Sequence, residues 1–274
     1  MKRELDLVVI SDVHLGTYGC HAKELVDYLR SIKPGTLIIN GDFIDIWQYR
    51  KSYFPLEHMQ VIQHVAKLAT HGTKVFYLTG NHDDVLRRYS DFSTGMFSLR
   101  DKLVLQLDGK KYWFFHGDVF DASIKYAPWI AKLGGKGYDL LIILNRLINV
   151  WRSKFGLSSF SFAKKIKSQV KEAVKIISDF EDTAIQLAIE KGYDGVICGH
   201  IHRHQIRPVQ TEQGRTVTYL NSGDWVESLT SLEYSFGKWS IYQYDKTDYE
   251  VVNPKLLIKK KKKELFGKRA TSGL

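Results

Sequence analysis

The sequence has few cysteines and no long apolar run, and both shortages exclude classes of protein. Cys20 and Cys198 are its only cysteines, so a disulfide framework is excluded and free thiols in a reducing compartment are expected. The apolar stretch at residues 5–10 is too short for a signal peptide. The run at residues 140–144 is far below the roughly 20 residues that a membrane span needs. We therefore expect a cytoplasmic protein that, if it meets a membrane, binds peripherally at the inner face.

The net charge of +10 is concentrated in one segment. Residues 255–269 hold eight lysines and arginines against one glutamate, and the rest of the chain is close to neutral. A basic tail at residues 251–274 suits an anionic surface, either lipid headgroups or nucleic acid. A charge run of this kind is equally compatible with a solvated terminus that binds nothing.

Short apolar runs alternate with helical patterns in the first half of the chain. The runs lie at residues 5–11, 36–40 and 74–79, and helices are expected at 22–31 and 56–71. This alternation is typical of a parallel sheet covered on both faces. Asp108-Gly109 between two apolar runs predicts a hairpin, and further strand-like segments lie at 195–198, 205–209, 216–220 and 239–244. The order predicts an α/β fold, a two-sheet β-sandwich flanked by helices.

The pattern changes after Phe120. Strand signals vanish up to about residue 191, and aromatic side chains alternate with many lysines. We interpret residues 120–180 as a helical insertion that caps a core made of residues 1–119 and 181–250. No internal repeat is visible.

Five short motifs contain the residues that could carry out chemistry. Apolar strand residues precede each motif, so each is expected at the end of a strand. The motifs are Asp12-Val-His14, Gly41-Asp42-Phe-Ile-Asp45, Gly80-Asn81-His82-Asp83, His116-Gly117-Asp118 and Gly199-His200-Ile-His202.

The five strand ends should bring these side chains to one crevice, because residues just past the carboxyl ends of strands face a common edge of the sheet. Each motif alone is more often a turn, a helix cap or a surface pair. Five in order, all rich in metal-ligand residue types, favour a metal site instead. Oxygen and imidazole ligands suit Mn²⁺, Fe or Zn²⁺ rather than Ca²⁺ or a thiolate-bound metal.

The motifs resemble the signature of the calcineurin-like metallophosphoesterase superfamily, which reads D-x-H, G-D-x-x-D, G-N-H-D/E, H and G-H-x-H. The resemblance covers residues 12 to 202 and implies an enzyme that hydrolyses phosphoric esters with two divalent metal ions, manganese first, with iron or zinc as alternatives. It implies one set of ligands for each ion and a carboxylate that bridges the ions. The first set is Asp12, His14 and His202, the second is Asn81, His116 and His200, and the bridge is Asp42.

The resemblance also implies that His82 is no ligand. This histidine would lie over the substrate and be oriented by Asp45. Two divalent ions about 3.5–4 Å apart can clamp phosphate oxygens and lower the pKa of a shared water, so a hydroxide can attack phosphorus. His82 could then protonate the leaving group, with Asp45 fixing its tautomer.

Within the superfamily the chain looks most like the UDP-2,3-diacylglucosamine hydrolases, which split a diphosphate to UMP and a lipid monophosphate in lipid A synthesis. The length, the insertion after His116-Gly117-Asp118 and residues 220–227, which resemble a closing N-x-G-D-W strand, carry this resemblance. Trp151 and Phe155 could receive acyl chains, and Lys164 and Lys167 could meet phosphate. Alternatively, the aromatic residues pack the insertion onto the core.

One position departs from that group. The hydrolases carry G-N-R-D, whereas this chain has His82, as general phosphoesterases do. A phosphodiesterase or phosphatase with another substrate is therefore an alternative, as is a nuclease, although the body lacks a wide basic stripe and nucleic acid is not the expected partner. A scaffold without activity is a further alternative, but such chains tend to lose ligands, and all seven are present here.

Overall fold

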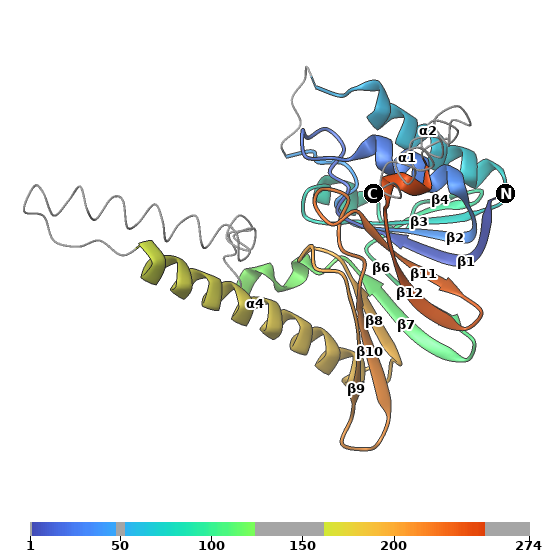
Figure 1. Cartoon of the computed structure of the whole chain (residues 1–274). Helices are drawn as coiled ribbons and strands as arrows, with labels where there is room; N and C mark the ends of the chain where they lie inside the picture. Colours follow the sequence, from blue (N-terminus) through green and yellow to red (C-terminus); the bar gives the residue numbers. More distant parts are fainter. Residues whose placement is uncertain (1, 48–52, 124–161, 250–274) are drawn as a thin grey trace, which may run out of the picture.

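A computed structural model describes residues 2–47, 53–123 and 162–249. Two mixed sheets form the centre of the molecule, with helices outside them (Figure 1). No helix in these ranges has an apolar stretch long enough to cross a membrane.

The first sheet contains all the strands that were expected in the first 80 residues. Its members are β1 (Arg3–Ile10), β2 (Ile32–Asn40), β3 (Lys74–Leu78), β4 (Ser93–Thr94), β5 (Phe97–Arg100), β11 (Thr230–Ser235) and β12 (Lys238–Gln243). Their order is β12-β11-β1-β2-β3-β5-β4. The strands β1, β2, β3 and β5 are parallel, with Val8 opposite Leu37 and Ile38 opposite Phe76. The parallel alternation expected from the sequence is confirmed.

The second sheet holds the hairpin expected at Asp108-Gly109. Its members are β6 (Lys102–Leu107), β7 (Lys110–Phe115), β8 (Gly195–Cys198), β9 (Gln205–Gln210) and β10 (Thr216–Asn221). Their order is β6-β7-β8-β10-β9, with β7, β8 and β10 parallel. Residues 220–227 are not a closing strand, because β10 ends at Asn221 and the chain continues as a loop.

Alternation along the strands fixes the packing of the layers. In β1, Leu7 and Val9 face the second sheet, whereas Val8 and Ile10 face the helices. The helices α1 (Ala22–Ser31) and α2 (Leu56–Thr70) cover that outer face, where Leu25 and Leu29 of α1 are fully buried. The predicted sandwich with flanking helices is therefore the observed architecture.

The helix α4 (Phe162–Glu190) covers the second sheet. Its buried residues Phe180, Ala184 and Ala188 pack on strands β8 and β10. Figure 1 shows the C-terminal half of α4 against this sheet and the N-terminal half projecting beyond it. The predicted border of the insertion at residue 180 thus falls inside one continuous helix.

Candidate metal centre

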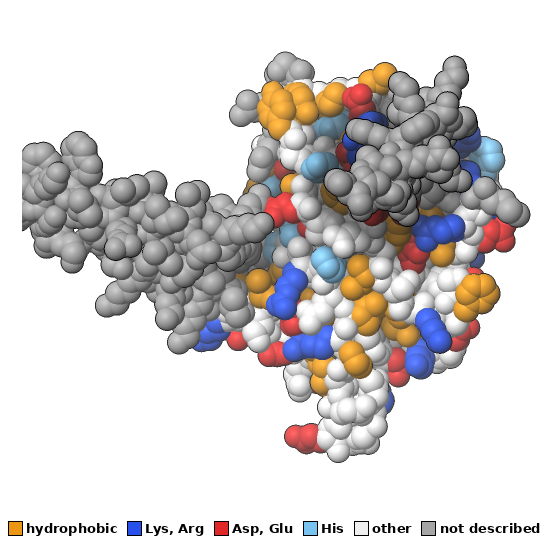
Figure 2. Space-filling model, viewed as in Figure 1, with side chains coloured by type: hydrophobic (Ala, Val, Ile, Leu, Met, Phe, Trp, Pro, Cys, Tyr) orange, Lys and Arg blue, Asp and Glu red, His pale blue; other side chains and the backbone are white. Residues whose placement is uncertain are grey.

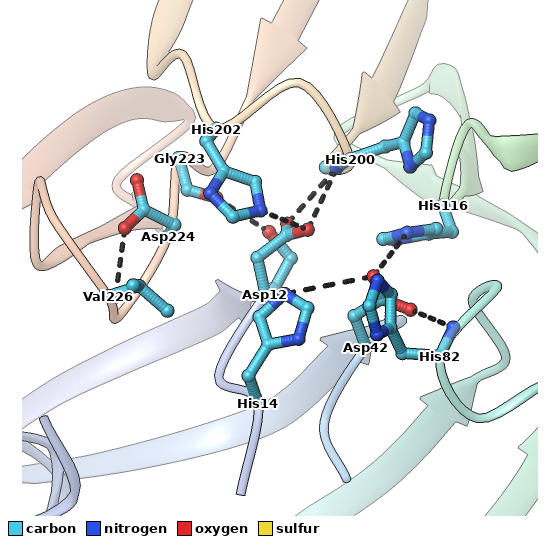
Figure 3. Close-up of polar contacts among 12 residues, drawn as sticks. Asp12, His14, Asp42, His82, His116, His200, His202, Gly223, Asp224 and Val226 are labelled. Atoms are coloured by element: carbon cyan, nitrogen blue, oxygen red, sulfur yellow. Dashed lines mark hydrogen bonds and ion pairs between the residues drawn. The ribbon is translucent and has the colours of Figure 1, made fainter. Parts of the chain in front are cut away.

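Side chains from five strand ends, in both sheets, meet at one edge of the sandwich. Figure 3 shows Asp12, Asp42 and His116 directed at a common centre. In the view of Figure 2, histidine side chains reach the surface between the helices of the first sheet and the hairpins of the second. The residues that meet are Asp12 and His14 after β1, Asp42 and Asp45 after β2, Asn81 and His82 after β3, His116 after β7, and His200 and His202 after β8.

Potential ligand atoms form three groups, each with its members within 4.8 Å of one another. Two of them, called the two ligand groups below, are Asp12, His14 and His202, and Asp42, His116 and His200. The third is His14, Asp45 and His82, which shares His14 with the first. Asp42 lies between the two ligand groups, since its Oδ2 is 3.3 Å from Nε2 of His116 and 3.8 Å from Nε2 of His14. In the first group, Nε2 of His202 is 3.3 Å from Oδ1 of Asp12. The arrangement offers places for two cations with one carboxylate near both.

Two of the histidines are oriented by contacts of their other ring nitrogen. Nδ1 of His116 lies 2.9 Å from the carbonyl oxygen of Asn40, and Nδ1 of His14 lies 3.2 Å from Oδ2 of Asp45. If each Nδ1–H donates there, the lone pair of each Nε2 is directed into the centre. Nε2 of His14 is buried and makes no hydrogen bond with the rest of the described chain. Such an orphaned nitrogen is what a metal ligand requires.

The surroundings of His116 also fit a cation. Its Nε2 is 3.2 Å from the amide oxygen of Asn81 and 3.3 Å from the carboxylate of Asp42. Three atoms with lone pairs this close repel one another unless a proton or a metal ion lies among them. The oxygen and imidazole donors fit Mn²⁺, Fe²⁺ or Zn²⁺.

Contacts between carboxylates and imidazoles shift the pKa values of residues in both ligand groups. Burial raises the pKa of Asp42, but the nearby charge of His116 outweighs it and lowers the value to about 2. Burial lowers the pKa of His202, but Asp12 raises it to about 9. Burial likewise lowers the pKa of His116, and Asp42 raises it well above its ordinary value. Without a bound ion, each carboxylate–imidazole pair favours a proton, and a divalent ion would compete with that proton for the ligand atoms.

His82 lies beside the two groups and is more accessible than His116. Its side chain is 21% exposed, whereas that of His116 is fully buried. Nδ1 of His82 is 2.9 Å from Oδ2 of Asp45, the same oxygen that is 3.2 Å from His14. Burial lowers the pKa of His82, but Asp45 and then Asp42 raise it above the ordinary value. The contact between His82 and Asp45 was expected from the sequence, whereas the sharing of Asp45 with His14 was not.

The backbone is left-handed at several of the candidate ligands. A positive φ costs a non-glycine residue about 1–3 kcal/mol and tends to occur at functional sites. This left-handed conformation directs the side chains toward the centre immediately after the strands end. The residues and their φ values are Asp12 (52°), His14 (53°), Asp42 (52°), His200 (67°) and His202 (53°).

The glycines of the motifs provide space for the ligands. A Cβ on Gly80 would lie 2.3 Å from Oδ1 of Asp42, and one on Gly199 would lie 2.6 Å from Oδ2 of Asp12. A Cβ on Gly41 would overlap the ring of His116. The glycines before Asp42, Asn81 and His200 are therefore each explained by another candidate ligand packed against them.

A loop that the sequence assigned to a strand supports the first ligand group. Asp224 is fully buried, and its carboxylate accepts a hydrogen bond from the N–H of Val226 at 2.8 Å (Figure 3). It accepts another from the hydroxyl of Ser228 at 2.6 Å. The next residue, Trp225, donates its backbone N–H to the carbonyl oxygen of Asp12 at 3.1 Å. The loop thereby holds the end of β1 in place.

Asp83, the last residue of the third motif, joins two ligand loops. It is buried and accepts hydrogen bonds from the N–H of Phe43 at 2.9 Å, the N–H of Gly80 at 2.6 Å and the hydroxyl of Tyr77 at 2.6 Å. Burial raises its pKa, and the Tyr77 hydrogen bond opposes that rise. No role was predicted for Asp83, although its place in the third motif was the available signal.

The expected substrate contacts are not among the described side chains. Trp151 and Phe155 lie outside the described residues, and Lys164 and Lys167 lie in the first part of α4, where only the helix is described. Further along α4, the ring of Phe180 lies 6.2 Å from that of His200. The helix therefore reaches the metal centre.

Several known proteins resemble this chain in sequence. The sequence model of the calcineurin-like phosphoesterases matches residues 5–204. A "UDP-2,3-diacylglucosamine hydrolase" of Aliivibrio fischeri is 25% identical over 87% of this chain and 98% of its own. A protein of the same name from Xanthomonas campestris is 27% identical over 80% of this chain and 90% of its own. A solved archaeal phosphodiesterase aligns with 86% of this chain and 98% of its own at 13% identity, with a TM-score of 0.40.

Proposed function

The chain belongs to the calcineurin-like phosphoesterase family and is a metal-dependent hydrolase of phosphoric esters, and from this premise we propose that it cleaves the diphosphate of UDP-2,3-diacylglucosamine to UMP and the lipid monophosphate. The position of Asp42 between the two ligand groups is the observation that supports hydrolysis with two metal ions. The substrate is inferred from relatives that bear this name and match the chain over most of both lengths.

We assign each ligand group one divalent ion, manganese first. Asn81 joins the second group through its amide oxygen, and Asp42 serves both ions. Bound there, the ions supply positive charge that neutralises the phosphate oxygens and acidifies a bound water. The ligand sets are Asp12, His14 and His202 for one ion, and Asn81, His116 and His200 for the other.

His82 and Asp45 act on the leaving group in this proposal. Nδ1 of His82 lies 2.9 Å from Oδ2 of Asp45, and this ion-pair contact favours a protonated ring held in one orientation. A protonated His82 can then deliver its Nε2 proton to the departing phosphate oxygen. The 21% exposure of its side chain gives a substrate access to the ring.

A substrate panel tests the proposal. We expect the full chain, loaded with Mn²⁺ or Mg²⁺, to release UMP from UDP-2,3-diacylglucosamine faster than it cleaves simple nucleotides, bis(p-nitrophenyl) phosphate or nucleic acid. Asp42→Asn is the control for contaminating activity, and metal-free protein is the control for metal dependence. Faster turnover of any other member of the panel would reject the substrate, but not the family.

A second candidate function is favoured by His82. The motif Gly80-Asn81-His82-Asp83 resembles that of general phosphoesterases, whereas UDP-2,3-diacylglucosamine hydrolases typically have G-N-R-D. Hydrolysis of another phosphodiester or a phosphomonoester is therefore the alternative. If this alternative holds, His82→Arg should raise activity on the UDP-linked lipid relative to the small diester. The reason is that arginine is typical of the lipid hydrolases at this position.

A further inference from the structure

A groove lined by cations lies between α1 and α2, on the outer face of the first sheet. The two helices lie side by side over this sheet in Figure 1. The groove has a volume of about 670 Å³. Its polar lining consists of Lys2 before β1, Arg30 of α1, and Gln60, Gln63, His64, Lys67 and Thr70 of α2.

Several cations of the described chain form ion pairs, whereas the three cations of this groove do not. Elsewhere Lys33 lies 3.0 Å from Glu4, and Arg100 lies 3.0 Å from Asp91. Within the described ranges, no carboxylate forms an ion pair with the three cations of the groove. Like charges that share a groove repel one another, so an anion placed among them would be stabilised.

His64 lies among these charges and responds to them. It is partly buried, and its Nε2 lies 3.2 Å from the carbonyl oxygen of Leu29. Burial lowers its pKa, the contact with Leu29 opposes the fall, and the three cations add to it. An anion in the groove would act on His64 in the opposite direction.

We propose that the groove between α1 and α2 is a second, non-catalytic binding site that takes a small soluble anion bearing phosphate. A guanidinium and two ammonium groups match the charge and hydrogen-bonding capacity of phosphate oxygens, and the two glutamine amides add neutral donors. The volume lies within the roughly 300–1,000 Å³ of small-ligand sites. A concave groove suits a compact anion better than a flat membrane surface.

The groove is separate from the metal centre. Lys2 precedes β1 and Asp12 follows it, and the eight residues of that strand span roughly 26 Å at about 3.3 Å per residue. An anion in the groove therefore does not touch the ligands of the ions, and the proposal does not depend on which phosphoester is hydrolysed.

The titration of His64 in the full chain tests the proposal. With Mg²⁺ bound, the ring proton signals are followed by NMR against pH in sodium chloride and in inorganic phosphate at equal ionic strength, and His64→Gln assigns the signal. We expect phosphate to raise the midpoint of His64 by about one unit, which is a tenfold coupling. Arg30→Gln with Lys67→Gln should abolish that rise.

A matched double variant separates binding from the general effect of charge. Lys23→Gln with Lys110→Gln removes the same net charge from exposed positions outside the groove, and it should retain the rise. Equal midpoints in chloride and phosphate, or equal rises in both double variants, would overturn the proposal. So would a rise seen only with phosphatidic acid vesicles, because that result would assign the groove to a membrane.

Discussion

The carboxylate of Asp42 lies 3.3 Å from a histidine of one ligand group and 3.8 Å from a histidine of the other. Two cations held on either side repel strongly, and an amide cannot offset that repulsion as a carboxylate does. We predict that Asp42→Asn binds fewer than two metal ions per chain and loses more than about 10²-fold in kcat. Metal content after gel filtration and steady-state rates would measure both effects.

Asp91→Asn is the matched control for this change. Asp91 also has a positive φ, 79°, but it is exposed and pairs with Arg100 away from the metal centre. It should keep normal metal content and rate. If Asp42→Asn did the same, two ions bridged by Asp42 would be excluded.

Asp45 and His82 should give different phenotypes although they contact each other. His82→Ala should keep both ions and lose roughly 10²-fold in kcat, because it removes only the proton donor. Asp45→Asn should lower both the rate and metal affinity, the latter by about 10–100-fold, because the same oxygen also orients His14. Metal titrations and rates of the two variants distinguish these outcomes. Loss of metal from His82→Ala, with the rate restored by excess metal, would make His82 a ligand instead.

Gly80 tests whether the motif glycines serve the ligands. An added Cβ would lie 2.3 Å from Oδ1 of Asp42 and 2.7 Å from its backbone nitrogen. Gly80→Ala should therefore weaken metal binding and lower the free energy of unfolding by about 1–3 kcal/mol. Gly72→Ala is the control, because its φ of 96° is strained for alanine but no atom lies within 4 Å of the new Cβ. It should lose stability with unchanged metal content, and the same result for Gly80→Ala would reject the explanation.

At the scale of elements, Arg87 links the segment after β3 to the end of β7. Its guanidinium lies 2.7 Å from Asp118 in the second sheet's ligand loop and 2.7 Å from Asp101 before β6. Because its side chain is 37% exposed, Arg87→Gln should cost only about 1 kcal/mol of unfolding free energy. We also expect a several-fold loss of kcat, because His116 lies two residues before Asp118.

The neighbouring Arg88 provides the comparison for that change. Arg88 donates to the carbonyl of Val85 and lies beside the ring of Tyr89, but it spans no two sheets. Arg88→Gln should leave the rate unchanged. A double-mutant cycle of Arg87→Gln and Asp118→Asn should show coupling, and additive losses would reject the link.

Elements with regular patterns were predictable from the sequence, and those with irregular patterns were not. The strands β1, β2 and β3 are apolar runs, and their positions were correct. β11 was missed because its buried positions include Ser231 and Glu233, and Glu233 tolerates burial through bonds to Arg3 and Tyr28. β4 and β5 were missed because each is at most four residues long.

The convergence of the motifs could also be predicted, but not their detailed geometry. Parallel strands place their carboxyl ends at one edge, so five motifs after apolar runs had to meet there. The positive φ of Asp12 and His202 and the sharing of Asp45 could not be predicted, because long-range packing determines them. For the same reason residues 220–227 were predicted to resemble a closing strand, although β10 ends at Asn221 and Asp224 holds the following residues as a loop.

At the scale of the whole molecule, the candidate ligands span only residues 12 to 202, and both sheets contribute to them. The basic segment at residues 255–269 lies outside this range and outside the described residues. Hydrolysis at the metal centre should therefore not depend on the positive charge of the basic segment. Removing residues 255–274 should leave metal content, thermal unfolding and the rate on a soluble diester unchanged.

The truncated chain should differ from the full chain in its binding to anionic membranes. Each lysine near an anionic surface contributes about 1 kcal/mol at moderate ionic strength. Co-sedimentation with phosphatidylserine vesicles should therefore fall steeply on truncation, and added salt should weaken the binding of the full chain. Replacing the five lysines at residues 259–263 with glutamine keeps the length and should reproduce the loss, which separates charge from chain length. If both variants bound vesicles as well as the full chain did, the basic segment would be a solvated terminus, and any membrane attraction would have to come from residues 120–180.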